Sequence, residues 1–258
     1  MILVDEQAEP GGSLLSTPEA MIDGLPAADW LARSLDELEK AENVTLMPRT
    51  TAIGYYHDNF LGLAERLTDH LKDGEADGPR ERLHRVWAKK IILATGAIER
   101  PLVFAGNDRP GVMLASAAQT FLNRYGVAVG ERIALVTSHD SGYQAAFDLA
   151  DANSQIVSII DCRPQVDENL QAEAEKRGIE VRVGWTVTAT AGRHRVSSVT
   201  TNKVNGDQVD PKGETLSCDA VIMSGGWTPS VHLWSHSKGS LKWREDLAAY
   251  VPDQANEN

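Results

Sequence analysis

The stretch IALVTSHDSGYQAAFDLADANSQIVSIID, residues 133–161, decides the fold of this chain. It opens with an apolar run at 133–137, continues with a helical segment from about Ser141 to Ala152, and closes with a second apolar run that ends at Asp161. Two short apolar runs joined by a helix predict a parallel strand–helix–strand unit. This spacing is typical of one half of a dinucleotide-binding fold.

Further strand and helix signals lie on both sides of this unit. Buried strands are expected at 2–4, 44–47, 91–96, 179–183 and 218–224, helices at 26–40, 116–125 and 167–177, and antiparallel strands at 50–56, 82–88, 186–190, 195–204 and near 215. The helix at 116–125 carries the Ser-x-x-Gln spacing of a capping box and ends at Gly126. The segment 73–79, which is polar and contains glycine and proline, predicts an exposed loop.

The order of these segments predicts an α/β fold of two Rossmann-like, FAD/NAD(P)-binding parallel sheets with antiparallel β-meanders. We expect three layers of the ββα/βαβ type, truncated at both ends. Residues 1–110 would form part of a first dinucleotide-binding domain, residues 111–217 an inserted second Rossmann-like domain, and residues 218–258 a truncated return to the first. The chain opens directly in a strand-like run without a basic leader, which favours a fragment.

Composition excludes several classes of function. The 258 residues include 25 Lys+Arg and 37 Asp+Glu, so the net charge of −12 would repel nucleic acid and anionic lipid. No apolar run approaches the ~20 residues of a membrane helix. We therefore expect a soluble, cytoplasmic protein.

Residues that commonly build metal or nucleophile sites do not form the required patterns. Cys162 and Cys218 are far apart with no C-x-x-C motif, which favours reduced, buried thiols. His232 and His236 are four residues apart within a tryptophan-rich segment, for which packing is the simpler interpretation than a zinc site. With no G-x-S-x-G elbow and no Walker loop, the sequence predicts neither a catalytic nor a metal residue.

Two positions carry the pattern of a nucleotide site at a strand end. Asp5 follows the strand at 2–4, and Gly11 and Gly12 come shortly after it. A carboxylate there can accept hydrogen bonds from a ribose diol, while glycines let backbone N–H groups approach a pyrophosphate. A surface acid before a turn explains the same residues equally well. The second position is Thr95-Gly96, where the chain would leave a buried strand.

The turn after residue 137 departs from the G-x-G-x-x-G pattern of a second nucleotide site. Thr137 and His139 stand where the first two glycines are expected, and only Gly142 remains. Asp161 nevertheless occupies the position of a ribose-binding acid. We interpret this second site as degenerate.

Four longer stretches closely resemble the amino-terminal half of alpha subunits of heterotetrameric sarcosine oxidases. They are VDEQ-x3-GGSL, KKIILATGAIERPLVFAGNDRPGVMLASAAQTFLNRYGV, the Asp140-Ser-Gly-Tyr turn with Asp161, and MSGGWTPSVHLWSH. The resemblance spans nearly the whole chain. It implies the fold of pyridine-nucleotide-disulfide oxidoreductases, an NAD in the alpha subunit, FAD and FMN on or shared with partner subunits, and beta, gamma and delta partners.

The resembling family oxidises sarcosine with oxygen to glycine, hydrogen peroxide and a one-carbon unit passed to tetrahydrofolate. Carried over by position, Asp5 would hold the adenosine ribose beside Glu6, and Gly11, Gly12 and Ser13 would line the loop over the dinucleotide. Thr50 would offer backbone groups to the adenine, and Thr95 and Gly96 would face the pyrophosphate. The second site would use Asp140, Gly142 and Asp161. The resemblance places amine oxidation on the beta subunit, so this part would bind cofactor and act as a scaffold.

The family's first strand and its G-x-G-x-x-G turn, roughly 30 residues, have no counterpart here. Three alternatives remain open. One is a stand-alone flavin-dependent NAD(P)H reductase, against which the cysteine spacing and Thr137-x-His139 argue. The others are the equivalent subunit of an amino-acid dehydrogenase or hydrogen cyanide synthase, and a non-catalytic interaction module with a structural nucleotide.

Overall fold

The strand–helix–strand unit predicted at residues 133–161 is confirmed in the computed structural model, which describes residues 1–72 and 77–253. Strand β10 (Arg132–Thr137) leads through helix α3 (Ser141–Asp151) to β11 (Gln155–Asp161), and the two strands are parallel. The contacts divide the chain into two units. Unit 1 comprises 1–97 and 229–258, and unit 2 comprises 98–228.

Unit 2 is built around a five-stranded sheet in the order β12-β11-β10-β17-β9. Its remaining elements are β9 (Val112–Leu114), α2 (Ala115–Tyr125), α4 (Glu168–Lys176), β12 (Val181–Val183), β13 (Trp185–Ala191), β14 (Ser198–Asn205), β15 (Gln208–Val209), β16 (Glu214–Ser217) and β17 (Ala220–Ser224). All pairs within the sheet are parallel. The antiparallel strands β13, β14, β15 and β16 form the expected meander, with Asn205-Gly206 at the β14–β15 turn.

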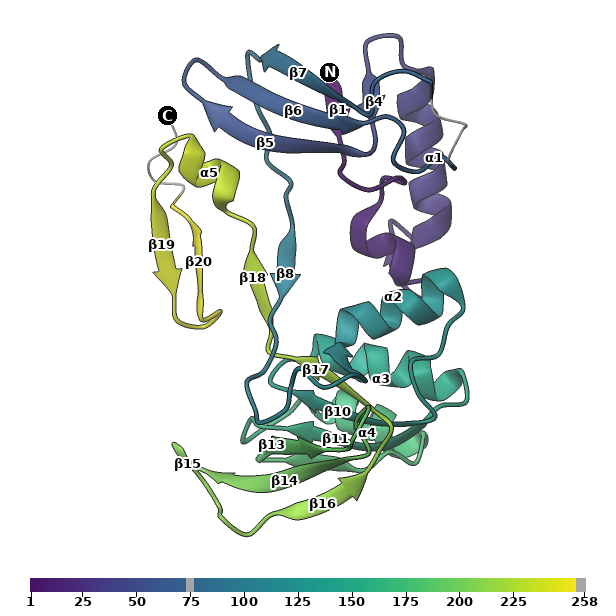
Figure 1. The fold of residues 1–258 in the computed structure, drawn as a ribbon, viewed down its shortest axis with the longest axis vertical. Helices are drawn as coiled ribbons and strands as arrows, with labels where there is room; N and C mark the ends of the chain where they lie inside the picture. Colours follow the sequence, from purple (N-terminus) through teal and green to yellow (C-terminus); the bar gives the residue numbers. More distant parts are fainter. Residues whose placement is uncertain (73–76, 254–258) are drawn as a thin grey trace. The chain divides into compact units, whose positions relative to one another are not determined.

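Two apolar clusters cover the two faces of this sheet, because side chains alternate between faces along each strand. Ile133 and Leu135 of β10 pack with the helices, including Tyr143 and Leu149 of α3. Ala134 and Val136 point the other way and pack with residues of the meander strands. Figure 1 shows the resulting layers within unit 2, with helices on one side of the sheet and β13, β14 and β16 on the other.

The segment 218–228 differs from its expected domain membership. The sequence predicts that strand β17 returns to the first domain, but it pairs with β10 on one side and β9 on the other and thus lies inside the sheet of unit 2. The hydrogen bonds that β17 makes with strands on both of its sides place it in the sheet of unit 2. Whether the evolutionary domains divide at 110/111 and 217/218 stays a prediction.

Unit 1 contains a two-stranded parallel pair and a three-stranded antiparallel sheet (Figure 1). Its elements are β1 (Ile2–Val4), the 3-10 helix η1 (Gly12–Ser16), β2 (Met21–Ile22), β3 (Leu25–Pro26), α1 (Ala27–Lys40), β4 (Thr45–Met47), β5 (Thr50–Tyr56), β6 (Phe60–Arg66), β7 (Glu81–Trp87), α5 (His232–His236), β19 (Leu241–Arg244) and β20 (Ala249–Pro252). The short strands β8 (Ala97–Glu99) and β18 (Trp227–Pro229), which pair with each other, lie where the chain passes from one unit to the other.

Several expectations for unit 1 are confirmed and others are wrong. Helix α1 begins after Pro26 as predicted, and β1 pairs with β4. Strands β5 and β7 are present, but β6 lies between them and pairs with both. Part of the loop expected at 73–79, residues 73–76, lies outside the described residues.

The buried strand expected at 91–96 is not formed. Within the described part of the chain these residues have no strand assignment, and the side chain of Ile92 is 91 % exposed. Ile2 of β1, also expected to be buried, is 46 % exposed. An apolar run becomes a strand only when a neighbouring strand accepts its hydrogen bonds, and the parallel sheet of unit 1 has only β1 and β4 among its described residues.

The capping box expected at Ser116 is also absent. Leu114 occupies the N-cap position of α2 without a side-chain bond, so Ser116 lies inside the first turn. The Glu99 carboxylate instead accepts a hydrogen bond from the Ser116 backbone N–H at 2.8 Å. At the other end Gly126 adopts a left-handed conformation, as predicted from its position.

Candidate nucleotide sites at two strand ends

Asp5 lies directly after β1, at the carboxyl end of the parallel β1–β4 pair, where ligands of open α/β sheets bind. Its half-buried carboxylate accepts a hydrogen bond from the Gln7 N–H through Oδ1 at 2.8 Å. Within the described residues no partner is found for Oδ2. Asp5 therefore has an acceptor free for a ligand hydroxyl. The neighbouring Glu6 is exposed, and its backbone carbonyl accepts a hydrogen bond from Arg66.

The glycine loop after Asp5 has the backbone conformations that only glycine adopts readily. Gly11 has φ +142°, and a Cβ there would lie 2.5 Å from Leu31 Cδ2 of α1. Gly12 has φ +55°, and a Cβ there would meet nothing within 4 Å, so its backbone is open to a ligand. Ser13 follows in η1 and is exposed, while its carbonyl accepts the Thr17 hydroxyl. This open loop fits a dinucleotide backbone.

Two residues expected near the adenine and pyrophosphate are already engaged by the protein. Thr50 is buried, and its N–H donates to the Asp5 carbonyl at 2.9 Å. That N–H is not available to an adenine. The Thr95 hydroxyl donates to the Ser230 carbonyl at 2.6 Å. Gly96, with φ +64° and open space around it, is accessible on its backbone side.

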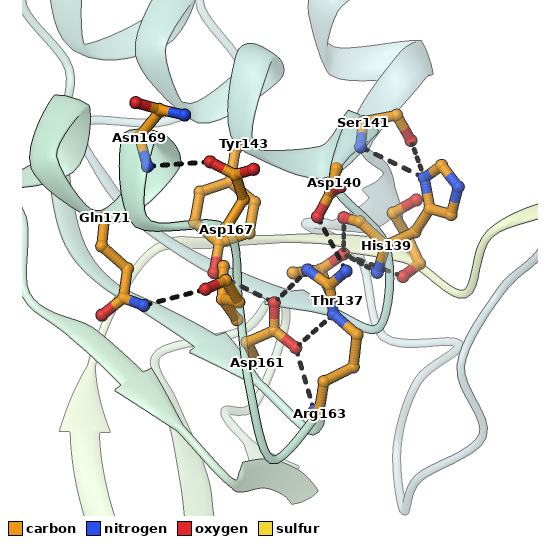
Figure 2. Close-up of polar contacts among 12 residues, drawn as sticks. Thr137, His139, Asp140, Ser141, Tyr143, Asp161, Arg163, Asp167, Asn169 and Gln171 are labelled. Atoms are coloured by element: carbon orange, nitrogen blue, oxygen red, sulfur yellow. Dashed lines mark hydrogen bonds and ion pairs between the residues drawn. The ribbon is translucent and has the colours of Figure 1, made fainter.

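At the second site, at the carboxyl end of β11, the acid is Asp161, and its hydrogen bonding differs from that of Asp5 (Figure 2). Asp161 has no solvent exposure. Its Oδ1 accepts hydrogen bonds from Arg163 N and Nε at 3.0 Å each, and its Oδ2 accepts from Arg163 Nη2 at 2.7 Å and from the Tyr143 hydroxyl at 3.0 Å. Both oxygens are therefore occupied, and Asp161 has no acceptor left for a ribose.

Arg163 joins this acid to the turn at 137–142. Its Nη1 lies 2.7 Å from Asp140 Oδ1, directly before α3. The paired carboxylates raise the pKa of Arg163 still further above its ordinary value, so the guanidinium stays charged. Burial and the adjacent Asp161 raise the pKa of the Tyr143 phenol well above its usual range. We found no sequence signal for Arg163, which is two residues beyond Asp161.

The turn at 137–142 is closed by its own side chains. Thr137 Oγ1 accepts from His139 N at 3.0 Å, and His139 Nδ1 accepts from Ser141 N at 3.1 Å. At Gly142, a Cβ would lie 2.9 Å from Thr137 Oγ1. Gly142 thus permits close packing of α3 on β10, which is the role of the third glycine in the dinucleotide motif. In this structure the acceptors of Asp161 and the turn at 137–142 are engaged by hydrogen bonds within the protein.

The two thiols do not form a redox pair within the described part of the chain; both are free. Burial raises the pKa of Cys218 to about 11, and burial also raises the pKa of Cys162. Neither is a thiolate at neutral pH, so neither is an activated nucleophile.

In residues 1–72 and 77–253, no helix is long and apolar enough to cross a membrane. No cluster of ligands for a metal ion is found in those residues.

Comparisons with known proteins agree with the fold. The profile of the family described as Pyridine nucleotide-disulphide oxidoreductase matches residues 16–253. The chain is 43 % identical to a sarcosine oxidase subunit alpha of Rhizobium meliloti (strain 1021) over 97 % of its length, which is 24 % of that protein. It is 39 % identical to a sarcosine oxidase subunit alpha of Corynebacterium sp. (strain P-1), covering 100 % of this chain and 27 % of that one.

Among solved structures, the crystal structure of T. acidophilum thioredoxin reductase is similar to this chain, with a TM-score of 0.67 at 18 % identity, over 93 % of this chain and 73 % of that chain. This likeness supports the Rossmann-like architecture. The chain spans about a quarter of the length of the curated alpha subunits that it matches. By its fold and by the profile match over most of its residues, the chain belongs to the pyridine nucleotide-disulphide oxidoreductase family.

Proposed function

We propose that this chain is the dinucleotide-binding part of an oxidase alpha subunit of the sarcosine oxidase type, with NAD at the carboxyl end of β1. The observation that carries this proposal is the contrast between two acids. Asp5 keeps a carboxylate oxygen free beside an open glycine loop, whereas Asp161 has both oxygens bonded within the protein.

The first site is supported by its position as well as its acid. Asp5 follows a strand of a parallel pair, and Gly12 and Gly96 expose backbone that a pyrophosphate can approach. We propose Asp5 as the acceptor for the adenosine ribose, with Glu6, Gly11, Gly12 and Ser13 alongside. Thr50 and Thr95 would act by shaping the site, since their donors are used internally.

The whole assembly is proposed to work in the cytoplasm with beta, gamma and delta subunits that carry or share FAD and FMN. It would oxidise sarcosine with oxygen to glycine and hydrogen peroxide, and pass one carbon to tetrahydrofolate. The part described here would bind nucleotide and support its partners without supplying a catalytic residue. The similarity to named alpha subunits supports this proposal.

The test is calorimetric titration of the full-length protein with NAD⁺. Replacing Asp5 with Ala removes an acceptor for the ribose hydroxyls, so the affinity should fall about tenfold or more, as expected for a hydrogen bond to a charged group. Asp36→Ala is the matched control, because Asp36 is an exposed carboxylate paired with Lys40 on α1. Equal affinities for the Asp5→Ala variant and the parent would refute the proposed site.

A further inference from the structure

One face of the antiparallel β5–β6–β7 sheet in unit 1 carries exposed apolar side chains. Because side chains alternate along a strand, Leu83, Arg85 and Trp87 of β7 lie on the same face. Phe60 of β6 lies directly opposite Trp87, and Tyr56 of β5 lies directly opposite Phe60. Leu83 and Trp87 are each 64 % exposed, and Tyr56 is 50 % exposed. We call these five residues the aromatic face.

Three rings of the aromatic face form a ladder that ends at β7. The ring centroids of Tyr56 and Phe60 lie 5.3 Å apart, and those of Phe60 and Trp87 lie 4.7 Å apart, with the ring planes 30° and 24° from parallel. These spacings are close to the distance of about 4.7–4.9 Å between neighbouring strands. A strand added beside β7 would therefore place a side chain at the next step of the ladder, against the exposed ring of Trp87.

The backbone of β7 has hydrogen-bonding groups free on one side. The strand lies at the edge of its sheet (Figure 1). On either side of β7, Ala88 N donates to the Asn59 carbonyl at 3.0 Å, and the Arg80 carbonyl accepts from Leu67 N at 2.9 Å. Hydrogen-bonded and non-hydrogen-bonded pairs alternate in an antiparallel ladder, so the even-numbered residues of β7 bond to β6. The N–H and C=O groups of the odd-numbered residues point outward, where no described strand pairs with β7.

This edge is basic, although the chain as a whole is acidic. Residues 80–90 contain five Lys+Arg and one acid, whereas the net charge of the chain is −12. Two of the five cations have carboxylate partners. The other three, Arg85, Lys89 and Lys90, are exposed, and no ion pair joins them to any residue that the structure describes. The edge therefore attracts acidic groups.

Charge also disfavours a second copy of β7 as the occupant of this edge. Two antiparallel copies of the strand centred on Arg85 would place cation opposite cation, which is destabilising. Cations on an edge strand commonly prevent such self-association. Protection alone does not require Leu83 and Trp87 to be exposed on the same face, and an exposed apolar patch usually marks an interaction site.

We propose that β7 binds an extended acidic segment of another protein, which adds a fourth strand to the β5–β6–β7 sheet. Backbone groups of the added strand would pair with the free edge, and its side chains would set the specificity. A carboxylate would lie opposite Arg85, with apolar or aromatic side chains opposite Leu83 and Trp87. The pattern apolar-x-acid-x-apolar fits in either chain direction. Asp5 and the glycine loop are not part of this surface, so the proposal goes beyond the proposed function and does not depend on it.

The experiment follows the fluorescence anisotropy of a labelled heptapeptide, equal in length to β7, as the full-length protein is added. The peptide has glutamate at its centre, phenylalanine two residues to either side of the glutamate, and threonine at the other four positions. A second peptide has lysine in place of the glutamate. A third has proline in place of the two threonines beside the glutamate, which disfavours pairing as a strand. The glutamate peptide should bind more tightly than the other two.

Variants of β7 test the two features of the surface separately. Arg85→Ala should weaken binding of the glutamate peptide about two- to fivefold, as for an exposed charge pair. Arg85→Glu should reverse the preference and favour the lysine peptide, a result that loss of fold cannot produce. Trp87→Ala removes the end of the aromatic ladder and should weaken binding about tenfold.

The matched controls are an arginine and a tryptophan outside the aromatic face. Arg33 is an exposed arginine of α1 paired with Glu37, and Trp243 is an exposed tryptophan of β19. Arg33→Ala and Trp243→Ala should bind the glutamate peptide as the parent protein does. Thermal unfolding of every variant separates loss of binding from loss of fold.

Amide hydrogen exchange locates the bound peptide. At saturation the glutamate peptide should slow exchange in residues 80–90, because the outward N–H groups of β7 gain acceptors. The proposal is overturned if the parent protein binds neither charged peptide or binds them equally, or if the proline peptide binds as tightly as the glutamate peptide. Binding that is unchanged in both Arg85→Glu and Trp87→Ala, or that leaves exchange in residues 80–90 unaltered, also overturns it. Asp5→Ala should lose NAD⁺ affinity and keep the binding of the glutamate peptide, which distinguishes failure of this proposal from failure of the proposed function.

Discussion

Asp161 ends β11 and Asp5 directly follows β1, yet their surroundings give the two strand-end carboxylates different numbers of free acceptors. A carboxylate has about four acceptor positions, and the four donors from Arg163 and Tyr143 satisfy those of Asp161. Removing one member of such a buried ion pair leaves an uncompensated charge, so the network resists change. An acid at a strand end therefore does not by itself identify a ribose site. The hydrogen-bond donors around the acid determine whether its oxygens are free to accept from a ribose.

Tyr143 allows a direct measurement of this network. Replacing it with Phe leaves Asp161 with one donor fewer and should lower the free energy of unfolding at pH 7 by about 1.5–3 kcal/mol. Burial, with Asp161 next in importance, raises the pKa of Tyr143 above its ordinary value of 10.0. The unfolded chain therefore releases this proton near pH 10 while the folded chain keeps it, and this contribution to stability declines as the pH rises above 10.

Urea unfolding of the parent and of Tyr143→Phe at pH 7 and across pH 9–11 gives both quantities. The variant should lose stability less steeply than the parent in the alkaline range. Phe147 lies in the same helix, and its ring contacts the Tyr143 ring edge-on. Because Phe147 has no titratable group, replacing it should change stability without changing the alkaline pH profile. Parallel pH profiles for parent and variant would contradict the raised pKa.

At the scale of elements, the start of helix α2 depends on a residue distant in sequence. Glu99 is only 4 % exposed, and its Oε2 accepts the Ser116 N–H at 2.8 Å, which supplies an acceptor and a negative charge to the helix N-terminus. Glu99→Ala should therefore lower the free energy of unfolding by about 1–2 kcal/mol, comparable to the loss of an N-cap. Glu99→Gln, which keeps an oxygen acceptor, should cost less.

Ser116→Ala is the control for this prediction, since Leu114 and not Ser116 is the N-cap residue of α2. Its effect should stay within about 0.5 kcal/mol. Denaturant unfolding monitored by helical circular dichroism compares the three variants. A larger loss for Ser116→Ala than for Glu99→Ala would restore the capping box that the sequence predicts.

The elements that the sequence predicts well are those whose signal is local. Helix α1 has its apolar stripe and Pro26, and the strand–helix–strand unit has its spacing. Strand β6 escapes prediction because Gly62 and Ala64 weaken its pattern, and its pairing with β5 and β7 forms it. The Glu99 cap and the Arg163 pair could not be predicted. The Glu99 cap joins residues that meet only in the tertiary fold. The Arg163 pair occupies the acceptors of Asp161 for which the motif implies a ligand.

For the whole molecule, the two units differ in how their sheets are covered. The sheet of unit 2 is buried on both faces by apolar clusters that include Leu135 and Val136. In unit 1, by contrast, Ile2 and Leu3 of β1 and Ile92 are exposed. The apolar pattern alone predicts burial for all three, because a sequence does not state which strand will cover a given side chain.

This difference predicts unequal local stability in the 258-residue chain. Amide hydrogen exchange should be slowest in β10, β11 and β17, whose amides open only when the doubly covered sheet is disrupted. Exchange should be much faster in β1 and β4, which form a two-stranded pair, and fastest at 91–95, where the backbone has no strand partner within the described residues. Mass spectrometry of peptides after timed exchange measures these rates. Protection of β1 equal to that of β10 would contradict this prediction and would show that the exposed apolar side chains of β1 are covered in solution. If a second copy of the chain covers them, a change in protein concentration should alter the exchange rate of β1 and leave that of β10 unaltered.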